Sequence, residues 1–316
     1  MNLDNPADRD ENARMEQSAS PRAVDTPRVS VVMATRNRAP QVALAIESFR
    51  AIRTGHAWEL IVVDNASTDG TWEVIESARR EQALQSLRLP EPGLCRAQNA
   101  GARLARAAII AFIDDDCYPE NDYIDRLVEA FDDPQVSFIG GRVLLHDPQD
   151  LPITIQTRET PIELRPGTPL EPGLMHGANL AFRTDVFHRV GGYDERLGPG
   201  SPCRSGGDWE LMLRTLAEGF AGRYDPRPTV RHHHGRRRLD EQRSLERRYD
   251  FGRGAVYMKT LLAGGAHRAN LCWLRRSIRE TIRAPRRDLR NVRARGRELM
   301  GACRFLLASG FGGRSA

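Results

Sequence analysis

Four short segments that read as strands, each followed by a polar stretch and a helix-like segment, constrain the fold of this chain more than any other feature. They lie at residues 29–34, 60–63, 87–89 and 108–113. Regular alternation of strands and helices is the pattern of a parallel sheet covered on both faces. The uninterrupted apolar run of the fourth segment is typical of a strand buried on both sides. We therefore predict an α/β fold with a mostly parallel, doubly wound sheet.

Polar residues directly follow three of these predicted strands. In parallel α/β sheets, ligands bind at the carboxyl ends of the strands, which meet at one edge. One ligand site is therefore expected at that edge. Its candidate residues are Thr35, Arg36 and Asn37 after the first strand, Asp64 and Asn65 after the second, and Asp114, Asp115 and Asp116 after the fourth.

The three consecutive aspartates are candidates for a metal site. Side chains two positions apart in an extended segment point the same way, so Asp114 and Asp116 should converge while Asp115 faces elsewhere. Converging carboxylates repel each other unless a hard cation such as Mg²⁺ or Mn²⁺ lies between them. Taken alone, the triplet fits a solvated acidic turn better than a metal site, so the surrounding motifs have to decide.

The second half of the chain is less regular. We predict a strand at residues 136–145 and a mobile, proline-rich loop over the site at 146–172. The remaining expected elements are a strand at residues 178–182, a helix at 208–218, short extended pieces near 224 and 229–230, and Arg-rich helices near 240–262, 271–283 and 288–308.

Several segments together resemble family 2 glycosyltransferases with the GT-A fold. Residues 29–37, 61–70 and 111–119 are similar, in order and spacing, to the donor-binding segments of that family. Residues 176–183 resemble its sugar-contacting strand, and residues 206–211 resemble its Gly-Glu-Asp-x-Asp-Leu motif. The motifs are weak singly but specific in combination, and they extend over roughly two thirds of the chain.

The resemblance implies an inverting transferase that uses a nucleoside-diphosphate sugar. It implies that Asp64 contacts the base, that Asp114 contacts the ribose or the metal, and that Asp116 binds Mg²⁺ or Mn²⁺. Aspartate at position 64 weakly favours a UDP-sugar. Arg96, near a helix start, could pair with the diphosphate, although a lone arginine usually lies at the surface. The expected donor-binding set is Thr35, Arg36, Asn37, Asp64, Asn65, Arg96, Asp114, Asp115 and Asn179.

Asp208 occupies the position of the aspartate that deprotonates the acceptor hydroxyl in the family. A helix-capping role for this carboxylate is the alternative, and it is compatible with catalysis. The sequence departs from the family motif at Gly207, where glutamate is common, and at Glu210, which replaces the second aspartate. Gly207 therefore puts in doubt any acceptor or loop contact that the missing carboxylate would make.

The histidine triplet at residues 232–234 falls where many relatives place a histidine that completes the metal or diphosphate site. His232 is the expected metal ligand beside Asp116, and His234 is the second choice. A neutral imidazole can bind Mn²⁺. The alternative is a solvated basic loop, because three arginines follow at residues 236–238.

The two parts of the chain before and after residue 223 differ in net charge. Residues 223–316 contain 24 Lys and Arg against 8 Asp and Glu, whereas the residues before them contain 23 and 34. We predict a disordered tail at 1–27, a GT-A domain at 28–235 and an Arg-rich helical extension at 236–316. Amphipathic arginine-rich helices can lie on anionic membrane, where lipid-linked acceptors reside. Solvated helices packed on the catalytic domain are an equal alternative.

Cysteine spacing and hydropathy further narrow the class of protein to which this chain can belong. Five scattered cysteines without a C-x-x-C pair suggest neither a disulfide framework nor a zinc site. No apolar run approaches the ~20 residues of a membrane span. We expect a cytoplasmic protein, peripheral at the inner face of the membrane if the extension binds lipid, that acts on a glycan or lipid-linked acceptor in cell-envelope or exopolysaccharide synthesis.

Three rival functions remain. A nucleotidyltransferase would need a Gly-rich phosphate loop after residues 29–34, and none follows. A nucleic-acid-binding protein would not need aspartates at three strand ends, and no helix-turn-helix or zinc finger is evident, so no nucleic acid is expected. A non-catalytic sugar-binding module would be excluded by turnover of a nucleotide sugar.

Overall fold

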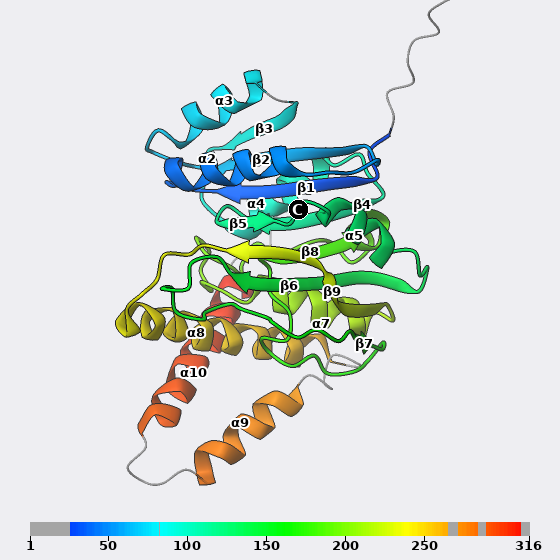
Figure 1. Cartoon of the computed structure of the whole chain (residues 1–316). Coiled ribbons are helices and arrows are strands. Elements are labelled where there is room, and N and C mark those ends of the chain that lie inside the picture. The colour runs from blue at the N-terminus through cyan, green and yellow to red at the C-terminus, as the bar shows by residue number, and fades with distance from the viewer. Residues whose placement is uncertain (1–25, 82, 265–270, 284–288, 311–316) are drawn as a thin grey trace, which may run out of the picture.

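The computed structural model describes residues 26–81, 83–264, 271–283 and 289–310 (Figure 1). The tail predicted at 1–27 lies almost wholly outside these residues. A single mixed sheet of nine strands crosses the molecule, in the order β3-β2-β1-β4-β8-β6-β9-β5, with β7 paired to β9. The strands are β1 Val29–Thr35, β2 Trp58–Asn65, β3 Leu84–Leu89, β4 Ile109–Asp114, β5 Cys117–Pro119, β6 Val136–Leu145, β7 Ile162–Leu164, β8 Asn179–Arg183 and β9 Ala221–His232.

The first four strands in the chain, β1 to β4, form the parallel half of the sheet, as predicted. β1 lies between β2 and β4, and its register sets Thr35 opposite Asp64 and Ala34 opposite Asp114. The predicted strand ends therefore meet at one edge. The other half is mixed, because β8 runs antiparallel to both β4 and β6, whereas β9 runs parallel to β6.

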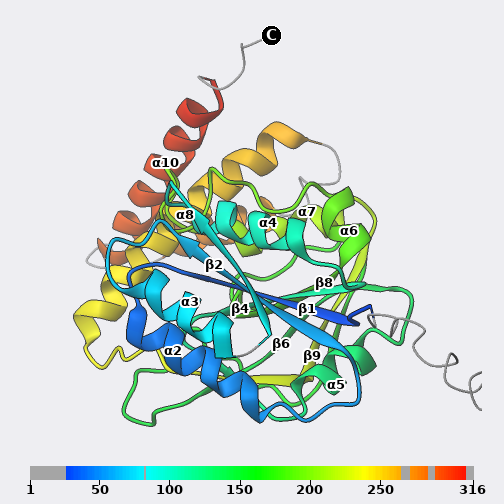
Figure 2. The ribbon, with the colours of Figure 1, turned by 90° about the horizontal axis from the view of Figure 1, so that it is seen from above.

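Helices cover both faces of the sheet, as Figure 2 shows from above, with α2, α3 and α5 on one side and α4, α6 and α7 on the other. A short 3-10 turn at Phe49–Ala51 follows α2. The helices are α2 Ala39–Ser48, α3 Thr71–Glu81, α4 Leu94–Leu104, α5 Tyr123–Ala130, α6 Thr184–Arg189, α7 Gly207–Ala217, α8 Leu239–Ala263, α9 Cys272–Arg283 and α10 Leu289–Gly310.

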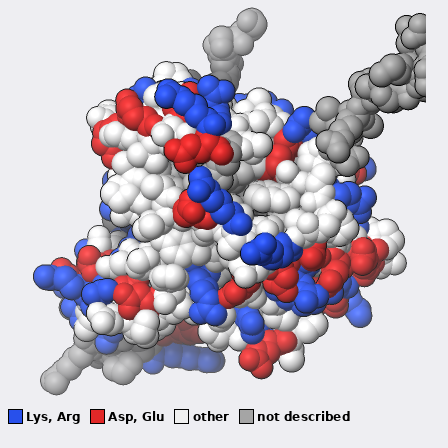
Figure 3. Space-filling model, turned by 45° about the horizontal axis from the view of Figure 1, so that its top comes forward, with Lys and Arg blue, Asp and Glu red and all other residues white. Residues whose placement is uncertain are grey.

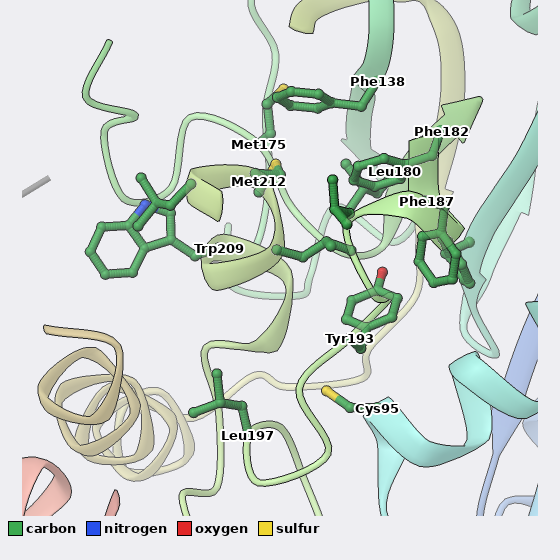
Figure 4. Packing of buried hydrophobic residues seen from close by; sticks show 14 of the residues in the cluster. Cys95, Phe138, Met175, Leu180, Phe182, Phe187, Tyr193, Leu197, Trp209 and Met212 are labelled. Atoms are coloured by element: carbon green, nitrogen blue, oxygen red, sulfur yellow. The ribbon is translucent and has the colours of Figure 1, made fainter. Parts of the chain in front are cut away.

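Alternation along each strand sends successive side chains to two separate hydrophobic cores. On β1, Val31 and Met33 are buried in the core beneath α2 and α5, whereas Val32 points into the core beneath α4 and α7. The second core is the more aromatic of the two, and Figure 4 shows Phe138, Phe182 and Phe187 packed around it. Burial of such side chains contributes roughly 1.5–3 kcal/mol each.

The helix after the aspartate turn begins later than its proline suggests. Pro119 could occupy the first turn of a helix, but Cys117–Pro119 forms β5, and α5 begins at Tyr123. The reason is tertiary: β5 pairs antiparallel with the end of β9, where Cys117 lies opposite His232. This pairing brings the aspartate turn and the histidine segment together.

The proline-rich segment at 146–172 contacts the rest of the molecule along much of its length. Its short strand β7 pairs antiparallel with β9, and Leu164 and Leu170 are buried in the aromatic core. Thr154 lies at the ligand cavity described below, which agrees with a segment over the site. Mobility of this segment remains a prediction.

The C-terminal helices α8 and α10 pack into the same core as the sheet. Val256 of α8 and Phe305 of α10 are both buried there, so packing continues across residue 235. The two helices cross closely, since a Cβ at Gly254 would overlap the backbone carbonyl of Glu298. α9 differs: its described residues include none that is buried, and in Figure 1 it lies apart from the sheet.

Candidate active site

A cavity of about 660 Å³ opens at the carboxyl ends of β1 and β4. Its far wall is formed by the start of α7 and by α8, so residues from both halves of the chain face one space. From the sheet side it is lined by Thr35, Arg36, Arg38, Asn65, Asp114, Asp115, Asp116 and His232, and from the far side by Gly177, Arg204, Asp208, Arg236, Arg248 and Tyr249.

All three aspartates line this cavity, so the prediction that Asp115 faces elsewhere is wrong. β4 ends at Asp114, and Asp115 and Asp116 form the turn into β5, where the alternation of an extended strand no longer applies. Asp115 accepts a hydrogen bond of 2.5 Å from the Thr35 hydroxyl. Thr35 therefore positions a carboxylate, and its predicted contact with the donor remains untested.

Arg38 neutralises part of the carboxylate charge. Its Nη2 lies 2.7 Å from Oδ2 of Asp116, and its Nε lies 3.2 Å from Oδ1 of Asp115. The sequence argument did not single out Arg38, although it stands one residue beyond the polar triplet after β1. An arginine in that place offers a guanidinium to carboxylates or to phosphate oxygens.

The pKa values of the three carboxyl groups diverge. Burial, together with the charge of Asp116, raises the pKa of Asp114 to about 7. Burial also raises the pKa of Asp115 to about 6, against the opposing effect of Arg38. At Asp116 burial is outweighed by the contacts with His232 and Arg38, and its pKa is lowered to about 2. A cation bound among these groups would therefore displace protons from the site.

The residues at this turn fit a hard divalent cation. Within the described part of the chain, Asp116, Cys117 and His232 bring potential ligand atoms within 4.8 Å of one another. Nε2 of His232 lies 3.3 Å from Oδ1 of Asp116, while the buried Nδ1 has no hydrogen-bond partner among the residues that the structure describes. Burial raises the pKa of the Cys117 thiol well above its ordinary value and keeps it protonated. Carboxylate and imidazole therefore remain, a donor set that suits Mn²⁺ or Mg²⁺.

His234, the second-choice ligand, has both ring nitrogens engaged. Its Nδ1 accepts a hydrogen bond of 2.9 Å from the backbone N–H of Arg236, and its Nε2 lies 2.9 Å from the carbonyl oxygen of Leu151. It anchors the chain between β9 and α8. His232, which faces Asp116, is the histidine that the structure brings to the aspartates.

Asp208 lies across the cavity from the aspartate turn, in the first turn of α7. Its Oδ2 accepts a hydrogen bond of 2.9 Å from the backbone N–H of Gly177, which fixes the direction of the carboxylate. The space for this contact exists because residue 177 is glycine: a Cβ there would approach the Asp208 side chain to 3.2 Å. A carboxylate oriented toward an open cavity can accept a proton from a bound hydroxyl group.

Gly207, the departure from the family motif, has a steric explanation. A Cβ at this position would overlap Sγ of Cys95, which α4 places against the start of α7. Figure 4 shows Cys95 beside Tyr193 and Leu197 in the same core. A larger residue at 207, glutamate included, therefore needs the side chain of Cys95 to shift or to be replaced.

The predicted base-binding turn is ordered by its own polar contacts. Asp64 is fully buried, accepts a hydrogen bond of 3.1 Å from the backbone N–H of Ser67 and lies 3.1 Å from Nε of Arg88. Asn65, whose side chain emerges on the opposite face of β2, lines the cavity instead. Asn37 bonds Thr68 through its side chain and does not line the cavity. Base contact by Asp64 thus stays a prediction.

Two predicted donor-binding residues point away from the cavity. Arg96 projects from α4 toward Glu91 and Glu195 and pairs with both. Asn179 is buried, accepts a hydrogen bond from the Tyr123 hydroxyl, and donates from its amide to the carbonyl oxygens of Arg142 and Pro228. Both polar atoms of that side chain thus have partners inside the fold, and its sugar contact stays a prediction.

The α8 side of the cavity was not anticipated from the sequence. Leu245, Arg248 and Tyr249 recur at helical spacing and turn one face of α8 toward Asp208. The Tyr249 hydroxyl lies 3.2 Å from the Thr154 hydroxyl. The segment expected to be a separate extension thereby supplies a wall of the site. Arginine content alone could not have indicated this, because exposed helices in the same region are equally rich in arginine.

Comparison with known proteins agrees with this geometry. Residues 30–191, slightly more than half of the chain, match the profile of the family described as "Glycosyl transferase family 2". The chain belongs to glycosyl transferase family 2. The matched region includes the aspartate turn but ends before Asp208 and His232, so the roles of those two residues rest on position in the structure and not on the match.

Curated relatives are similar at moderate identity. A pre-mycofactocin glycosyltransferase of Mycobacterium tuberculosis is 28% identical over 65% of this chain and 43% of its own length. Glycosyltransferase AglE of Haloferax volcanii is 27% identical over 62% of this chain and 63% of its own length. The chain thus spans less than two thirds of either relative.

Solved structures show the same fold. The mannosyltransferase PcManGT of Pyrobaculum calidifontis, in complex with GDP-Man and Mn²⁺, superposes on 92% of this chain and 76% of its own with a TM-score of 0.56 at 18% identity. TarS residues 1–349 of S. aureus, in complex with UDP-GlcNAc, superpose on 87% of this chain and 81% of their own with a TM-score of 0.53 at 15% identity. The fold is therefore that of the GT-A glycosyltransferases, as the sequence predicts.

Proposed function

We propose that this protein is an inverting glycosyltransferase that moves a sugar from a nucleoside-diphosphate sugar to an acceptor hydroxyl. One observation carries the proposal: Asp208 and the aspartate turn at 114–116 face each other across a single cavity of about 660 Å³. Membership of family 2 supports the chemistry, and the GT-A fold supports the use of a nucleotide sugar.

The sheet side of the cavity would bind the donor. Asp114, Asp116 and His232 would hold Mg²⁺ or Mn²⁺, which when bound supplies positive charge to the departing diphosphate. Arg36 and Arg38 offer guanidinium groups on the same side. Asn65 lines the adjoining space. A relative in E. coli is 25% identical over 62% of this chain, and its name specifies UDP-Glc as the donor. A UDP-sugar is therefore the expected donor.

The far side would bind the acceptor. Asp208, held by the N–H of Gly177, would accept the proton of the attacking hydroxyl while that oxygen approaches the anomeric carbon opposite the leaving group. Because attack and departure occur on opposite faces, the configuration at that carbon inverts. The expected acceptor is a glycan or a lipid-linked saccharide of cell-envelope or exopolysaccharide synthesis, and contact with the membrane would occur through the C-terminal helices.

Membrane contact would be peripheral, consistent with the predicted cytoplasmic location at the inner membrane face. No helix in the described part of the chain is long and apolar enough to cross a bilayer. Contact would therefore have to use the surfaces of amphipathic helices, as in proteins that lie in the interface plane.

A donor panel tests the proposal. Release of nucleoside diphosphate from UDP-, GDP- and dTDP-sugars is measured with Mn²⁺, with Mg²⁺ and with chelator, for the parent and for Asp116→Asn and Asp208→Asn. We expect each variant to lose about 10²–10⁴ in rate, as for removal of a charge-stabilising or proton-accepting group. Asp122→Asn, which removes an exposed carboxylate of the α5 cap, is the matched control. Parent-like release by Asp116→Asn would refute the mechanism.

A further inference from the structure

A second cavity, of about 640 Å³, lies between α8 and α10 and shares only Tyr249, among its described lining residues, with the cavity described above. Its walls are made largely of guanidinium groups. Among the described residues, six arginines line it together with two carboxylates, those of Glu246 and Asp250; the arginines are Arg243, Arg247, Arg253, Arg290, Arg293 and Arg297.

The carboxylates of this region do not neutralise all of its arginines. Asp250 is engaged by Arg253 and, at 2.6 Å, by Arg297. Arg243, Arg247 and Arg293 are exposed, and no carboxylate of the described residues lies within 4.0 Å of any of them. Three unpaired cations around one hollow repel each other. An anion with several oxygens would relieve that repulsion through charge-assisted hydrogen bonds.

The helices α8 and α10 that form this cavity, and α9, also carry exposed apolar side chains. Large hydrophobic residues exposed to solvent are concentrated in α8, α9 and α10; in the rest of the described chain only Leu44 and Leu104 belong to this class. On α10, Val292, Leu299 and Met300 are each more than half exposed. In Figure 3 Lys and Arg side chains are spread over this face of the molecule, and one group of them lies at the lower left, where α8 begins in Figure 1.

Charge and exposed apolar surface together indicate the kind of ligand. A nucleic-acid backbone would use the arginines but would leave the leucines and isoleucines in water. A bilayer surface uses both, because basic groups meet anionic headgroups while apolar side chains enter the acyl boundary. Ile278 and Ile282 on α9 add to the apolar surface, since both are exposed and α9 buries none of its described residues.

We propose that the cavity between α8 and α10 binds the phosphate group of an anionic membrane lipid, with the exposed apolar side chains of α9 and α10 in the headgroup–acyl boundary. Tyr249 lines both this cavity and the catalytic one, so lipid bound here would hold the membrane beside the acceptor side of the active site. The proposal shares membrane contact with the proposed function but does not require its chemistry.

Vesicle sedimentation of the full chain tests the site without donor or metal, so failure of catalysis would leave the result interpretable. Vesicles of phosphatidylcholine alone are compared with vesicles that also contain phosphatidylglycerol. The parent should pellet with the anionic vesicles, and the triple variant Arg243→Gln, Arg247→Gln, Arg293→Gln should bind them about tenfold or more weakly. The control Arg53→Gln, Arg80→Gln, Arg103→Gln removes the same charge from exposed positions elsewhere and should bind like the parent.

A second pair of variants tests the apolar contribution. Leu299→Gln with Met300→Gln should weaken binding to anionic vesicles, whereas Leu44→Gln with Leu104→Gln should not. Substitutions are preferable to truncation near residue 235, because Val256 and Phe305 belong to the core. Circular dichroism of each variant shows whether it is folded. The double variant at Leu299 and Met300 and the triple arginine variant test the apolar and the basic part of the surface independently.

Competition distinguishes lipid from other anions. Inorganic phosphate should displace the parent from anionic vesicles more effectively than chloride at the same ionic strength, and equal displacement would overturn a phosphate site in favour of diffuse attraction. Equal pelleting with neutral and anionic vesicles would overturn the proposal. It would likewise be overturned if duplex DNA bound the parent and not the triple variant while vesicles bound neither.

Discussion

The ammonium nitrogen of Lys259 lies 2.7 Å from a carboxylate oxygen of Glu210 and joins α8 to α7. The same nitrogen lies 2.7 Å from Oδ2 of Asp194, in the turn that follows α6. Lys259 is the only lysine in the sequence. It connects the C-terminal helices to the helix that carries Asp208, so the acceptor side of the cavity depends on a contact made far along the chain.

Replacing this lysine should destabilise the protein. Lys259→Met leaves Glu210 and Asp194 each with one cation fewer in a largely buried setting, while Arg214 and Arg196 still pair with them. We expect a loss of about 2 kcal/mol in the free energy of unfolding, below the full cost of an unpaired buried charge. Urea unfolding of Lys259→Met and of the charge-preserving Lys259→Arg measures the difference. Parent-like stability of the methionine variant would contradict this account.

Asp194 should make stability depend on pH. Burial alone would raise its pKa, but hydrogen bonds and charge from Arg196 and Lys259 outweigh it and hold the pKa well below its usual range. The unfolded chain therefore binds a proton that the folded one does not, and stability falls as the pH drops below about 4. Unfolding midpoints of the parent and Asp194→Asn should differ at neutral pH and converge in acid. A gap that widened in acid would reverse the predicted sign.

The contact between Cys95 and Gly207 predicts a strongly non-additive pair. Gly207→Ala in the parent should cost about 1–3 kcal/mol, because the new methyl group overlaps Sγ of Cys95. In a Cys95→Ala background the same change should be neutral or slightly stabilising, since alanine favours a helix more than glycine. Thermal unfolding of the four proteins gives the coupling. Equal effects in both backgrounds would show that the contact is not close.

A substitution of Asn179 tests whether this residue stabilises the fold or contacts the donor sugar. Asn179→Ala removes the partners of the Tyr123 hydroxyl and of two backbone carbonyl groups, all inside the fold. Stability should fall by about 2–3 kcal/mol. The KM for the donor, measured well below the melting temperature of the variant, should not change. A raised KM with parent-like stability would restore the sugar contact implied by the family resemblance.

The sequence was most informative where a strand ended. Apolar runs located β1, β2 and β4, and parallel register then brought Thr35, Asp64 and Asp114 to one edge. Strand alternation also sorts residues at that edge: Asn65 reaches the cavity from the face opposite to Asp64. To predict which of the two residues lines the cavity, one must know which face of the sheet borders the cavity, and the local sequence does not specify that.

Side-chain direction beyond the strands could not be predicted. Asp115 was predicted to face away from Asp114 and Asp116 because side chains alternate along a strand. The strand ends at Asp114, however, and Asp115 and Asp116 form a turn. Arg96 and Asn179 lie in segments that resemble ligand-binding ones, yet their partners, Glu195 and Tyr123, come from distant parts of the chain. α8 forms a wall of the active-site cavity because Val256 packs into the core. Helical periodicity shows that Val256 lies on an apolar face, but it does not show which part of the protein that face packs against.

The overlap between positions 95 and 207 orders the substitutions that this protein can accept. A glutamate at 207, common in the family, would overlap Sγ of Cys95 with its Cβ, so Cys95 would have to shift to accept it. A smaller residue at 95 removes that overlap, at the cost of a void in the core. Mutational paths between this chain and relatives with glutamate are therefore less costly when the change at 95 comes first.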